Sequence, residues 1–227
     1  MACRALIFAA GRGERMRPLT DTTPKPLLEV GGKTLIEHHL EKLALAGISD
    51  VVINTSHLAE QFPAALGDGS RWNLRIRYSY EGPTPLETGG GMRRALHWLG
   101  DEPFIAVSAD IWSDYDYARL TDPHTLAPDA WAHLVMVPNP DFHPRGDFCL
   151  DGDRLNQDDA GERLTFANIG LYRAALLSDQ PEGAFKLLPM YQRAMRARKL
   201  TGERYDGRWW NLGTPAQLAD LGSVFSV

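Results

Sequence analysis

The densest group of residues suited to phosphate chemistry lies in residues 8–27, FAAGRGERMRPLTDTTPKPL. Gly11 and Gly13 let the backbone bend tightly after an apolar run and leave its N–H groups open to a phosphate. Three cations surround the same loop: Arg15, Arg17 and Lys25. Prolines stiffen the loop, and we expect them to hold Lys25 at a defined reach. The loop therefore predicts a local anion site.

A carboxylate that suits magnesium follows a second apolar run. Asp110 ends FIAVSAD, residues 104–110, at the edge of a parallel sheet where such folds place ligands. Magnesium typically uses one or two protein carboxylates and completes its shell with phosphate oxygens and water. Taken alone, Asp110 is more typical of a turn or helix cap than of a metal ligand.

The spacing of apolar residues predicts elements that would bring these groups together. Buried strands are expected at residues 4–10, 51–54 and 104–110, and a half-exposed edge strand at 74–80. Helices are expected at 36–46, capped by Gly47, at 58–66, and after the Gly-rich turn ETGGG. Strands that alternate with helices favour a doubly wound, mostly parallel, Rossmann-like α/β sheet.

The second half of the chain is less regular. A strand is expected at 133–137, a hairpin at FCL-DGD-RL, a strand at LTFANIGLY, a helix at 183–200, and a strand, turn and helix in RWWNLGTPAQLADL. We expect one domain over 1–227, with a nucleotide part at about 1–115, a sugar-phosphate part at about 116–227, and a small β-hairpin lobe on its edge.

Composition excludes several classes of protein. The chain has 227 residues with 24 Lys plus Arg against 29 Asp plus Glu, a net charge of −5, so we expect no nucleic-acid or membrane partner. Cys3 and Cys149 are the only cysteines and predict neither a disulfide framework nor a metal site. No secretory signal pattern opens the sequence, so a cytoplasmic location is expected. The oligomeric state stays open.

Common phosphate motifs do not fit. Met16 stands where a dinucleotide fingerprint needs its third glycine, and Leu27 where a Walker loop needs its first. Instead, GRGERMRPLTDTTPKPL, PLETGGGMRRAL, SADIW, NIGLY, FKLLP and WWNLGTP together resemble the sugar-phosphate nucleotidylyltransferases. These enzymes make nucleotide sugars from a nucleoside triphosphate and a sugar 1-phosphate. The resemblance covers nearly the whole chain and implies a glycosyltransferase-A-like fold.

The resemblance also implies roles for individual residues. Arg15 and Lys25 would be catalytic, Mg²⁺ would be the cofactor, and Asp110 would bind it together with Asn211. The expected nucleotide-binding residues are Ala10, Gly11, Gly13, Glu81, Gly89 and Gly90. The expected sugar-phosphate residues are Asp110, Gly146, Asn168 and Lys186. Many family members carry aspartate at the position of Asn211, so the second metal ligand is in doubt.

Alternatives stay open for some of these residues and for the substrates. Glu81 is equally compatible with a solvated charge on an edge strand, Asn168 with a turn, and the glycines after Thr88 with a simple helix start. Within the family the blocks are most similar to enzymes that join UTP to N-acetylmuramate 1-phosphate in cell-wall recycling. The alternatives are GTP with mannose 1-phosphate, or a catalytically weak nucleotide-sugar binding protein.

Overall fold

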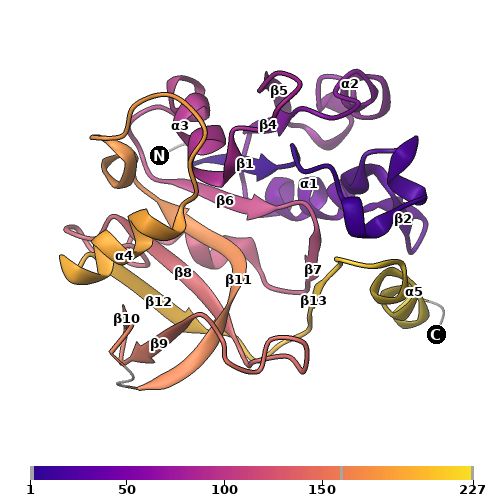
Figure 1. Ribbon diagram of the computed structural model, residues 1–227. Helices are drawn as coiled ribbons and strands as arrows, with labels where there is room; N and C mark the ends of the chain where they lie inside the picture. Colours follow the sequence, from indigo (N-terminus) through magenta and orange to yellow (C-terminus); the bar gives the residue numbers. More distant parts are fainter. Residues whose placement is uncertain (1–2, 159–160, 226–227) are drawn as a thin grey trace.

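A mixed nine-stranded sheet runs through the protein, as the computed structural model in Figure 1 shows. The structure describes residues 3–158 and 161–225, so the expected domain ends, residues 1 and 227, lie outside it. In sheet order the strands are β5 (Arg75–Tyr80), β4 (Asp50–Thr55), β1 (Arg4–Phe8), β6 (Phe104–Ser108), β11 (Glu162–Tyr172), β8 (Ala132–Val137), β12 (Leu200–Arg204), β10 (Arg154–Asn156) and β9 (Phe148–Asp151).

Helices and two short ribbons surround this sheet. The helices are α1 (Leu35–Leu45), α2 (Gln61–Leu66), α3 (Glu87–Leu99), α4 (Leu188–Arg196) and α5 (Pro215–Val224). The ribbons pair β2 (Glu29–Val30) with β3 (Lys33–Thr34), and β7 (Ile111–Ser113) with β13 (Trp209–Asn211). The 3₁₀ helices are Glu14–Met16, Leu19–Asp21, Lys25–Leu27, Ser70–Trp72, Tyr117–Thr121 and Ala174–Leu177. Within the described residues, no helix is both long and apolar enough to span a membrane.

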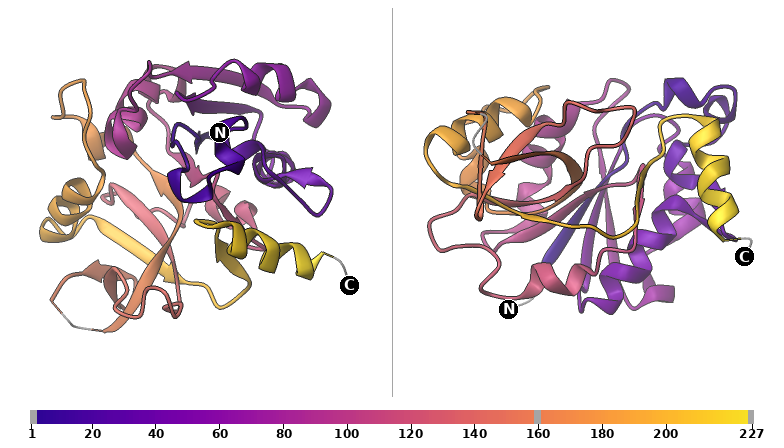
Figure 2. Two further views of the ribbon diagram at one scale, coloured as in Figure 1. Left: turned by 45° about the vertical axis from the view of Figure 1, so that its right-hand side comes forward. Right: turned by 90° about the horizontal axis from the view of Figure 1, so that it is seen from below.

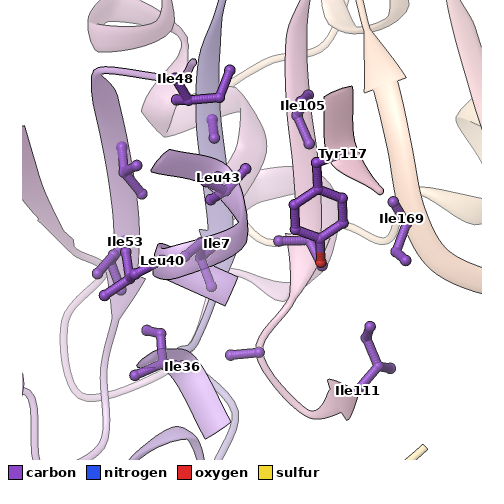
Figure 3. Packing of buried hydrophobic residues seen from close by; sticks show 14 of the residues in the cluster. Ile7, Ile36, Leu40, Leu43, Ile48, Ile53, Ile105, Ile111, Tyr117 and Ile169 are labelled. Atoms are coloured by element: carbon purple, nitrogen blue, oxygen red, sulfur yellow. The ribbon is translucent and has the colours of Figure 1, made fainter. Parts of the chain in front are cut away.

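The parallel half of the sheet is buried on both faces, which explains its nearly continuous apolar strands. Ile7 and Ile53 point to one face, where Ile36, Leu40 and Leu43 of α1 cover them (Figure 3). Leu6 points to the other face and belongs to the core that α3 and α4 cover. Each side chain of this kind contributes roughly 1.5–3 kcal/mol when fully buried. The two cores fix the ends of β1 and β6, where the site lies.

Helix α1 has regular caps at both ends. Its first turn is closed by a capping box, in which the Thr34 N–H donates to Glu37 Oε2 at 2.7 Å and the Glu37 N–H donates to Thr34 Oγ1 at 3.4 Å. Its last turn ends at Gly47, which has φ +79°. The Ile48 N–H donates to the Leu43 carbonyl at 3.0 Å, as in a Schellman motif. The expected glycine cap is therefore confirmed.

The second half of the sheet departs from the expected parallel arrangement. Strand β11 is antiparallel to both β6 and β8, whereas β8 and β12 are parallel. The expected hairpin is present as β9 and β10. Strand β9 also pairs with the start of β11, with Glu162 opposite Leu150. Strands β11, β8, β12, β10 and β9 therefore close into a ring.

Three expected elements were wrong in extent. The helix expected after ETGGG begins within that segment, at Glu87. The helix expected at 183–200 covers only Leu188–Arg196, and the residues after it form β12, which the sequence did not indicate. The helix expected at 58–66 begins at Gln61. Helices α4 and α5 lie on opposite sides of the molecule in both views of Figure 2. Residues 183–187 are not helical, and Phe185 among them is bound by the first turn of α3, as described below.

Candidate active site

A cleft of about 700 Å³ opens at the carboxyl ends of β1 and β6. Parallel strands that end together leave such a crevice outside the sheet. The cleft contains the three residues on which the expected chemistry depends, Arg15, Lys25 and Asp110. Its lining residues are Phe8, Ala9, Ala10, Gly11, Arg12, Gly13, Glu14, Arg15, Lys25, Pro26, Asn54, Glu81, Pro85, Glu87, Thr88, Ser108, Asp110 and Gly213.

Lys25 is held against Asp110 at the floor of this cleft. Its ammonium Nζ lies 2.8 Å from Asp110 Oδ2, and its side chain is only 8% exposed. Gly13, at φ +63°, lies so close to Lys25 that a Cβ atom there would come within 3.1 Å of the lysine Cβ. The Asp110 side chain is 41% exposed, so the carboxylate remains open to the cleft.

Arg15 also lines this cleft. Its guanidinium lies over Gly213, where a Cβ atom would come within 3.0 Å of the arginine Nη2. Gly213 follows β13 and precedes α5, so an element near the end of the chain leaves room for a cation from near its start. Any larger residue at 213 would displace the guanidinium.

Arg17 does not join these cations, contrary to the sequence prediction. Its Nε lies 3.2 Å from Asp21 Oδ1, and its side chain is 61% exposed. It is not among the cleft residues, whereas Arg12 is. The prediction relied on distance along the chain, and the 3₁₀ turn at Glu14–Met16 directs neighbouring arginines differently.

A buried polar pair forms the opposite wall of the cleft. Glu81 is only 7% exposed, so its interpretation as a solvated edge charge was wrong. Asn54 Nδ2 donates to Glu81 Oε1 at 2.6 Å, and the Leu86 N–H donates to Glu81 Oε2 at 2.7 Å. Asn54 Oδ1 accepts the Ala9 N–H at 2.6 Å. Burial raises the pKa of Glu81.

This pair fixes the backbone around the cleft. Through Asn54 and Glu81 the ends of β1, β4 and β5 are tied to the start of α3. Gly91 packs directly on the pair, and a Cβ atom at 91 would come within 2.6 Å of Asn54 Nδ2. Sequence reasoning missed Asn54. Its signal was a polar residue at the carboxyl end of a buried strand.

Gly89 and Gly90 have a different role from the one expected. Both N–H groups donate to the Phe185 carbonyl, at 2.8 and 3.1 Å. Neither glycine lines the cleft. The close backbone approach expected for a nucleotide is made instead by residues 183–187, which the first turn of α3 holds in place. Lys186 lies in that segment.

A second cavity of about 520 Å³ adjoins the cleft. Phe8, Glu87, Thr88 and Ser108 line both spaces. The second cavity contains the predicted residues Asn168, Lys186 and Asn211. Its other lining residues are Ala106, Phe142, His143, Asp147, Phe148, Thr165, Phe166, Tyr172, Leu187, Leu188, Tyr191 and Trp209. Asn168 sits in a β-bulge of β11 with φ +58°, so the alternative of a simple turn is wrong.

Gly146 does not line this cavity. It lies with Arg145 in a shallower third space, together with Asn139 and Arg163. It has φ +58°, and a Cβ atom there would come within 2.8 Å of the Leu164 carbonyl oxygen. The glycine therefore serves the packing of the 139–147 loop on β11. Its neighbour Asp147 lines the second cavity and accepts the Phe166 N–H at 2.8 Å.

Comparison with known proteins shows the family to which the chain belongs. The model of the nucleotidyl transferase family matches residues 4–145. The chain belongs to this family. A relative from Neisseria meningitidis serogroup B, an N-acetylmuramate alpha-1-phosphate uridylyltransferase, is 43% identical to the enzyme over 221 residues, 96% of each chain. A Caulobacter vibrioides protein of the same description is 36% identical over 95% of the enzyme and 94% of its own length.

More distant relatives align with a shorter part of the enzyme. A mannose-1-phosphate guanylyltransferase from Mycobacterium tuberculosis is 37% identical over 137 residues, which are 60% of the enzyme and 38% of that relative. Among solved structures, a putative glucose-1-phosphate thymidylyltransferase from Bacillus anthracis superposes with a TM-score of 0.84 at 20% identity, covering 99% and 95% of the two chains. This likeness shows the α/β, glycosyltransferase-A-like fold.

The predicted metal ligands of the enzyme lie on adjacent elements but line different spaces. Asp110 lines the cleft and Asn211 the second cavity. Strand β13 pairs with β7 so that Asn211 lies opposite Ile111, and the Leu212 N–H donates to the Asp110 carbonyl at 2.9 Å. Within residues 3–158 and 161–225, no three His, Cys, Asp or Glu side chains converge on a common point. One open carboxylate fits magnesium that takes its other ligands from phosphate and water.

Helix α1 supports the strand that follows Asp110. His39 is buried, its Nε2 lies 2.8 Å from the Ile111 carbonyl, and its Nδ1 lies 2.7 Å from the Tyr117 hydroxyl. A carbonyl can only accept, so Nε2 carries the proton and Nδ1 accepts from Tyr117. Burial lowers the pKa of His39 to about 3. One turn later, Lys42 Nζ donates to the Ser113 carbonyl at 2.6 Å.

Proposed function

We propose that the enzyme transfers a uridylyl group from UTP to N-acetylmuramate 1-phosphate, with release of pyrophosphate. The observation that carries the reaction class is the shared cleft of Arg15, Lys25 and Asp110. The likeness to the Neisseria meningitidis uridylyltransferase over 96% of both chains supports the choice of substrates. Because N-acetylmuramate is a cell-wall sugar, we also propose a role in cell-wall recycling in the cytoplasm.

The reaction is an in-line displacement at phosphorus. A phosphate oxygen of the sugar 1-phosphate forms a bond to the α-phosphorus of UTP while the bond to the bridging oxygen of pyrophosphate breaks. The attacking phosphate is already ionised, so no side chain has to remove a proton. The enzyme must instead bring two polyanions together and offset their charge.

Cations at the cleft supply that charge. Arg15 and Lys25 would bind the triphosphate from opposite sides of the glycine loop, near the N–H groups of residues 10–13. Lys186, in the adjoining cavity, would bind the phosphate of the sugar, and Asn168 a sugar hydroxyl. Phe8, Thr88 and Ser108 line both spaces, so the two substrates would meet beside them. The β9–β10 hairpin belongs to this sugar side.

Magnesium is proposed as the cofactor, with Asp110 as its protein carboxylate. When bound, the ion would offset charge on the triphosphate oxygens. Lys25, 2.8 Å from the same carboxylate, would remain close enough to bind the same phosphates. The amide oxygen of Asn211 would add a neutral ligand, which binds magnesium more weakly than a carboxylate would.

Pyrophosphate release tests the reaction and its substrates together. The purified enzyme would be incubated with magnesium, one nucleoside triphosphate and one sugar 1-phosphate, in all combinations. We expect the highest kcat/KM with UTP and N-acetylmuramate 1-phosphate. A preference for GTP with mannose 1-phosphate would replace the proposed substrates by the guanylyl pair. No release with any pair would indicate a nucleotide-sugar binding protein.

Asn211→Asp tests the second metal ligand. A carboxylate at this position should bind Mg²⁺ more tightly than the amide does, so the magnesium concentration for half-maximal rate should fall about tenfold. Titration of pyrophosphate release with magnesium measures it. Asn156→Asp, on β10 and outside the residues that line the cleft or the second cavity, is the control and should leave the titration unchanged. An unchanged titration in Asn211→Asp would remove residue 211 from the metal site.

A further inference from the structure

The boundary between the two cavities contains a residue in an unfavourable backbone conformation. Glu87, the first residue of α3, has φ +61°. Residues with a Cβ atom avoid this left-handed region, and side chains other than glycine persist there only where their surroundings impose it. Asn168, across the second cavity, has φ +58°. Within residues 3–158 and 161–225, the other non-glycine residues with positive φ are Leu58, Asn73 and Arg198, and none of these lines the cleft or the second cavity.

The surroundings of Glu87 impose this conformation from both sides. Before it, the Leu86 N–H donates to Glu81 Oε2 at 2.7 Å, and the Leu86 carbonyl accepts the Phe185 N–H at 3.2 Å. After it, the Phe185 carbonyl accepts the Gly89 N–H at 2.8 Å. Thr88 Oγ1 accepts the Leu187 N–H at 3.1 Å. The backbone of residue 87 is therefore placed by its neighbours.

The carboxylate of Glu87 contributes nothing to this clamp. It forms no hydrogen bond or ion pair with any other described residue, and it is exposed toward both cavities. A strained residue that stabilises nothing by its side chain is destabilising for the fold. Strain of this kind is concentrated at binding sites, which indicates that the carboxylate acts on a ligand.

The negative charge of the Glu87 carboxylate limits which groups of the substrates it can contact. Both substrates carry phosphates, and a carboxylate would repel them. An ionised carboxylate accepts hydrogen bonds, and the donors that the two proposed substrates offer are neutral hydroxyl and amide N–H groups. Asn168, the other residue of this cavity with positive φ, also lines the same space. A sugar is rich in such donors.

We propose that Glu87 is a specificity-determining residue whose carboxylate accepts hydrogen bonds from hydroxyl or amide N–H groups of the sugar 1-phosphate. This inference rests on the proposed function, because it assumes that the second cavity binds the sugar. Under this proposal, Glu87 contacts the uncharged groups of the sugar, and the cations bind the phosphate of the sugar 1-phosphate.

Three substitutions separate the carboxylate from the strain. Glu87→Ala removes the carboxylate and keeps a Cβ atom, Glu87→Gly removes both, and Glu87→Gln keeps an acceptor oxygen without the charge. The KM for N-acetylmuramate 1-phosphate should rise about 10- to 100-fold in Glu87→Ala and Glu87→Gly, and less in Glu87→Gln. The KM for UTP should stay within about twofold of that of the natural enzyme.

Stability gives a second readout. Glu87→Gly should raise the Tm by about 2–4 °C because it relieves the strain, whereas Glu87→Ala should not. Arg198→Gly is the matched control, since it relieves the same conformation between α4 and β12. It should raise the Tm and leave both KM values unchanged. We therefore expect both glycine variants to gain stability, but only Glu87→Gly to lose affinity for the sugar 1-phosphate.

Several outcomes would overturn the inference. An unchanged KM for the sugar 1-phosphate in Glu87→Ala would exclude the contact, and a selective rise in the KM for UTP would place the carboxylate on the ribose instead. Either of these two results can be obtained only if the natural enzyme is active, so the proposed function would still hold. If the natural enzyme releases no pyrophosphate with any substrate pair, the proposed function fails and the inference falls with it. Should Glu87→Gly not fold, the Ala and Gln variants still decide.

Discussion

Lys25 and Arg17 come from the same loop, but only Lys25 faces the cleft. Lys25→Met keeps the buried aliphatic stem and removes the charge beside Asp110, so kcat should fall by about 10²–10³ through loss of transition-state stabilisation. Its effect on folding should be small, because the Asp110 side chain is 41% exposed and water can solvate it. Pyrophosphate release at saturating substrate measures kcat.

Arg17→Met is the matched control for this prediction. It removes a cation at the same loop but breaks only a surface pair with Asp21, worth about 0–1 kcal/mol. We expect kcat within about twofold of that of the natural enzyme. Equal losses in both variants would mean that the loop acts through its net charge and not through the position of Lys25.

Glu81 uses both carboxylate oxygens as acceptors for buried donors. In Glu81→Gln only one oxygen remains, so either Asn54 Nδ2 or the Leu86 N–H loses its acceptor. The free energy of unfolding should fall by about 1–3 kcal/mol, and the KM for UTP should rise as the cleft wall loosens. Urea unfolding measures the first and initial rates the second. Glu102→Gln, in an exposed loop, should change neither; equal stability of the two variants would show that the Glu81 network is dispensable.

At the scale of elements, a buried histidine joins α1 to β7, and this contact makes stability depend on pH. The ordinary pKa of histidine is 6.5, and burial lowers that of His39 to about 3. Between these values the unfolded chain binds a proton that the folded protein excludes, so the free energy of unfolding falls as pH falls below 6.5. From pH 7 to pH 5 the loss should be about 2 kcal/mol.

His39→Gln isolates this contribution. The variant should be less stable at every pH, but its loss of stability between pH 7 and pH 5 should be smaller than that of the natural protein by about 2 kcal/mol. Urea unfolding at both pH values gives the difference. Burial also lowers the pKa of His133, which is present in both proteins and therefore cancels. His97→Gln, on the exposed end of α3, should keep the natural pH dependence; the same dependence in His39→Gln would contradict the assignment.

Elements with a strong local signal were predictable, and those held by distant partners were not. Strands β1, β4 and β6 are apolar runs because both faces of the sheet are covered there. Strand β12, LTGER, has one large apolar residue and a glycine, and its pairing with β8 determines its structure. The segment before α4 is not helical, because the Phe185 backbone binds the start of α3, almost 100 residues away in sequence.

The same distinction holds within the site. Arg15, Lys25 and Asp110 could be identified because glycine spacing, a strand end and the family resemblance all indicated them. Asn54 had only the weak signal of a polar residue at the end of a buried strand, because its role arises from Ala9 and Glu81, which directly follow two other strands. The strain at Glu87 could not be predicted from the sequence either, because a glutamate disfavours positive φ and only its neighbours in the fold impose it.

On the scale of the whole molecule, one sheet links the expected nucleotide and sugar parts. Alternate residues of the same strands enter opposite cores: Ile105 and Val107 of β6 belong to one, Phe104 and Ala106 to the other. Strand β11 follows β8 in the sequence but lies between β6 and β8 in the sheet. The two parts therefore share their central strand, and neither can complete its sheet without the other.

This topology predicts the behaviour of a fragment that ends where the match to the family model ends, residues 1–145. It lacks β11 and β12, so β6 loses one neighbour and β8 loses both. The exposed apolar edge cannot be repaired by the remaining strands, and the fragment should show no cooperative unfolding by far-UV circular dichroism. Residues 1–214 are the matched control. They lack only α5, which packs in a small separate cluster with Val30, Leu35 and Leu212, so this fragment should unfold cooperatively at a lower Tm than the full chain. A sharp transition in residues 1–145 would show that the first half holds its structure alone, and the coupling of the two parts through β11 would have to be abandoned.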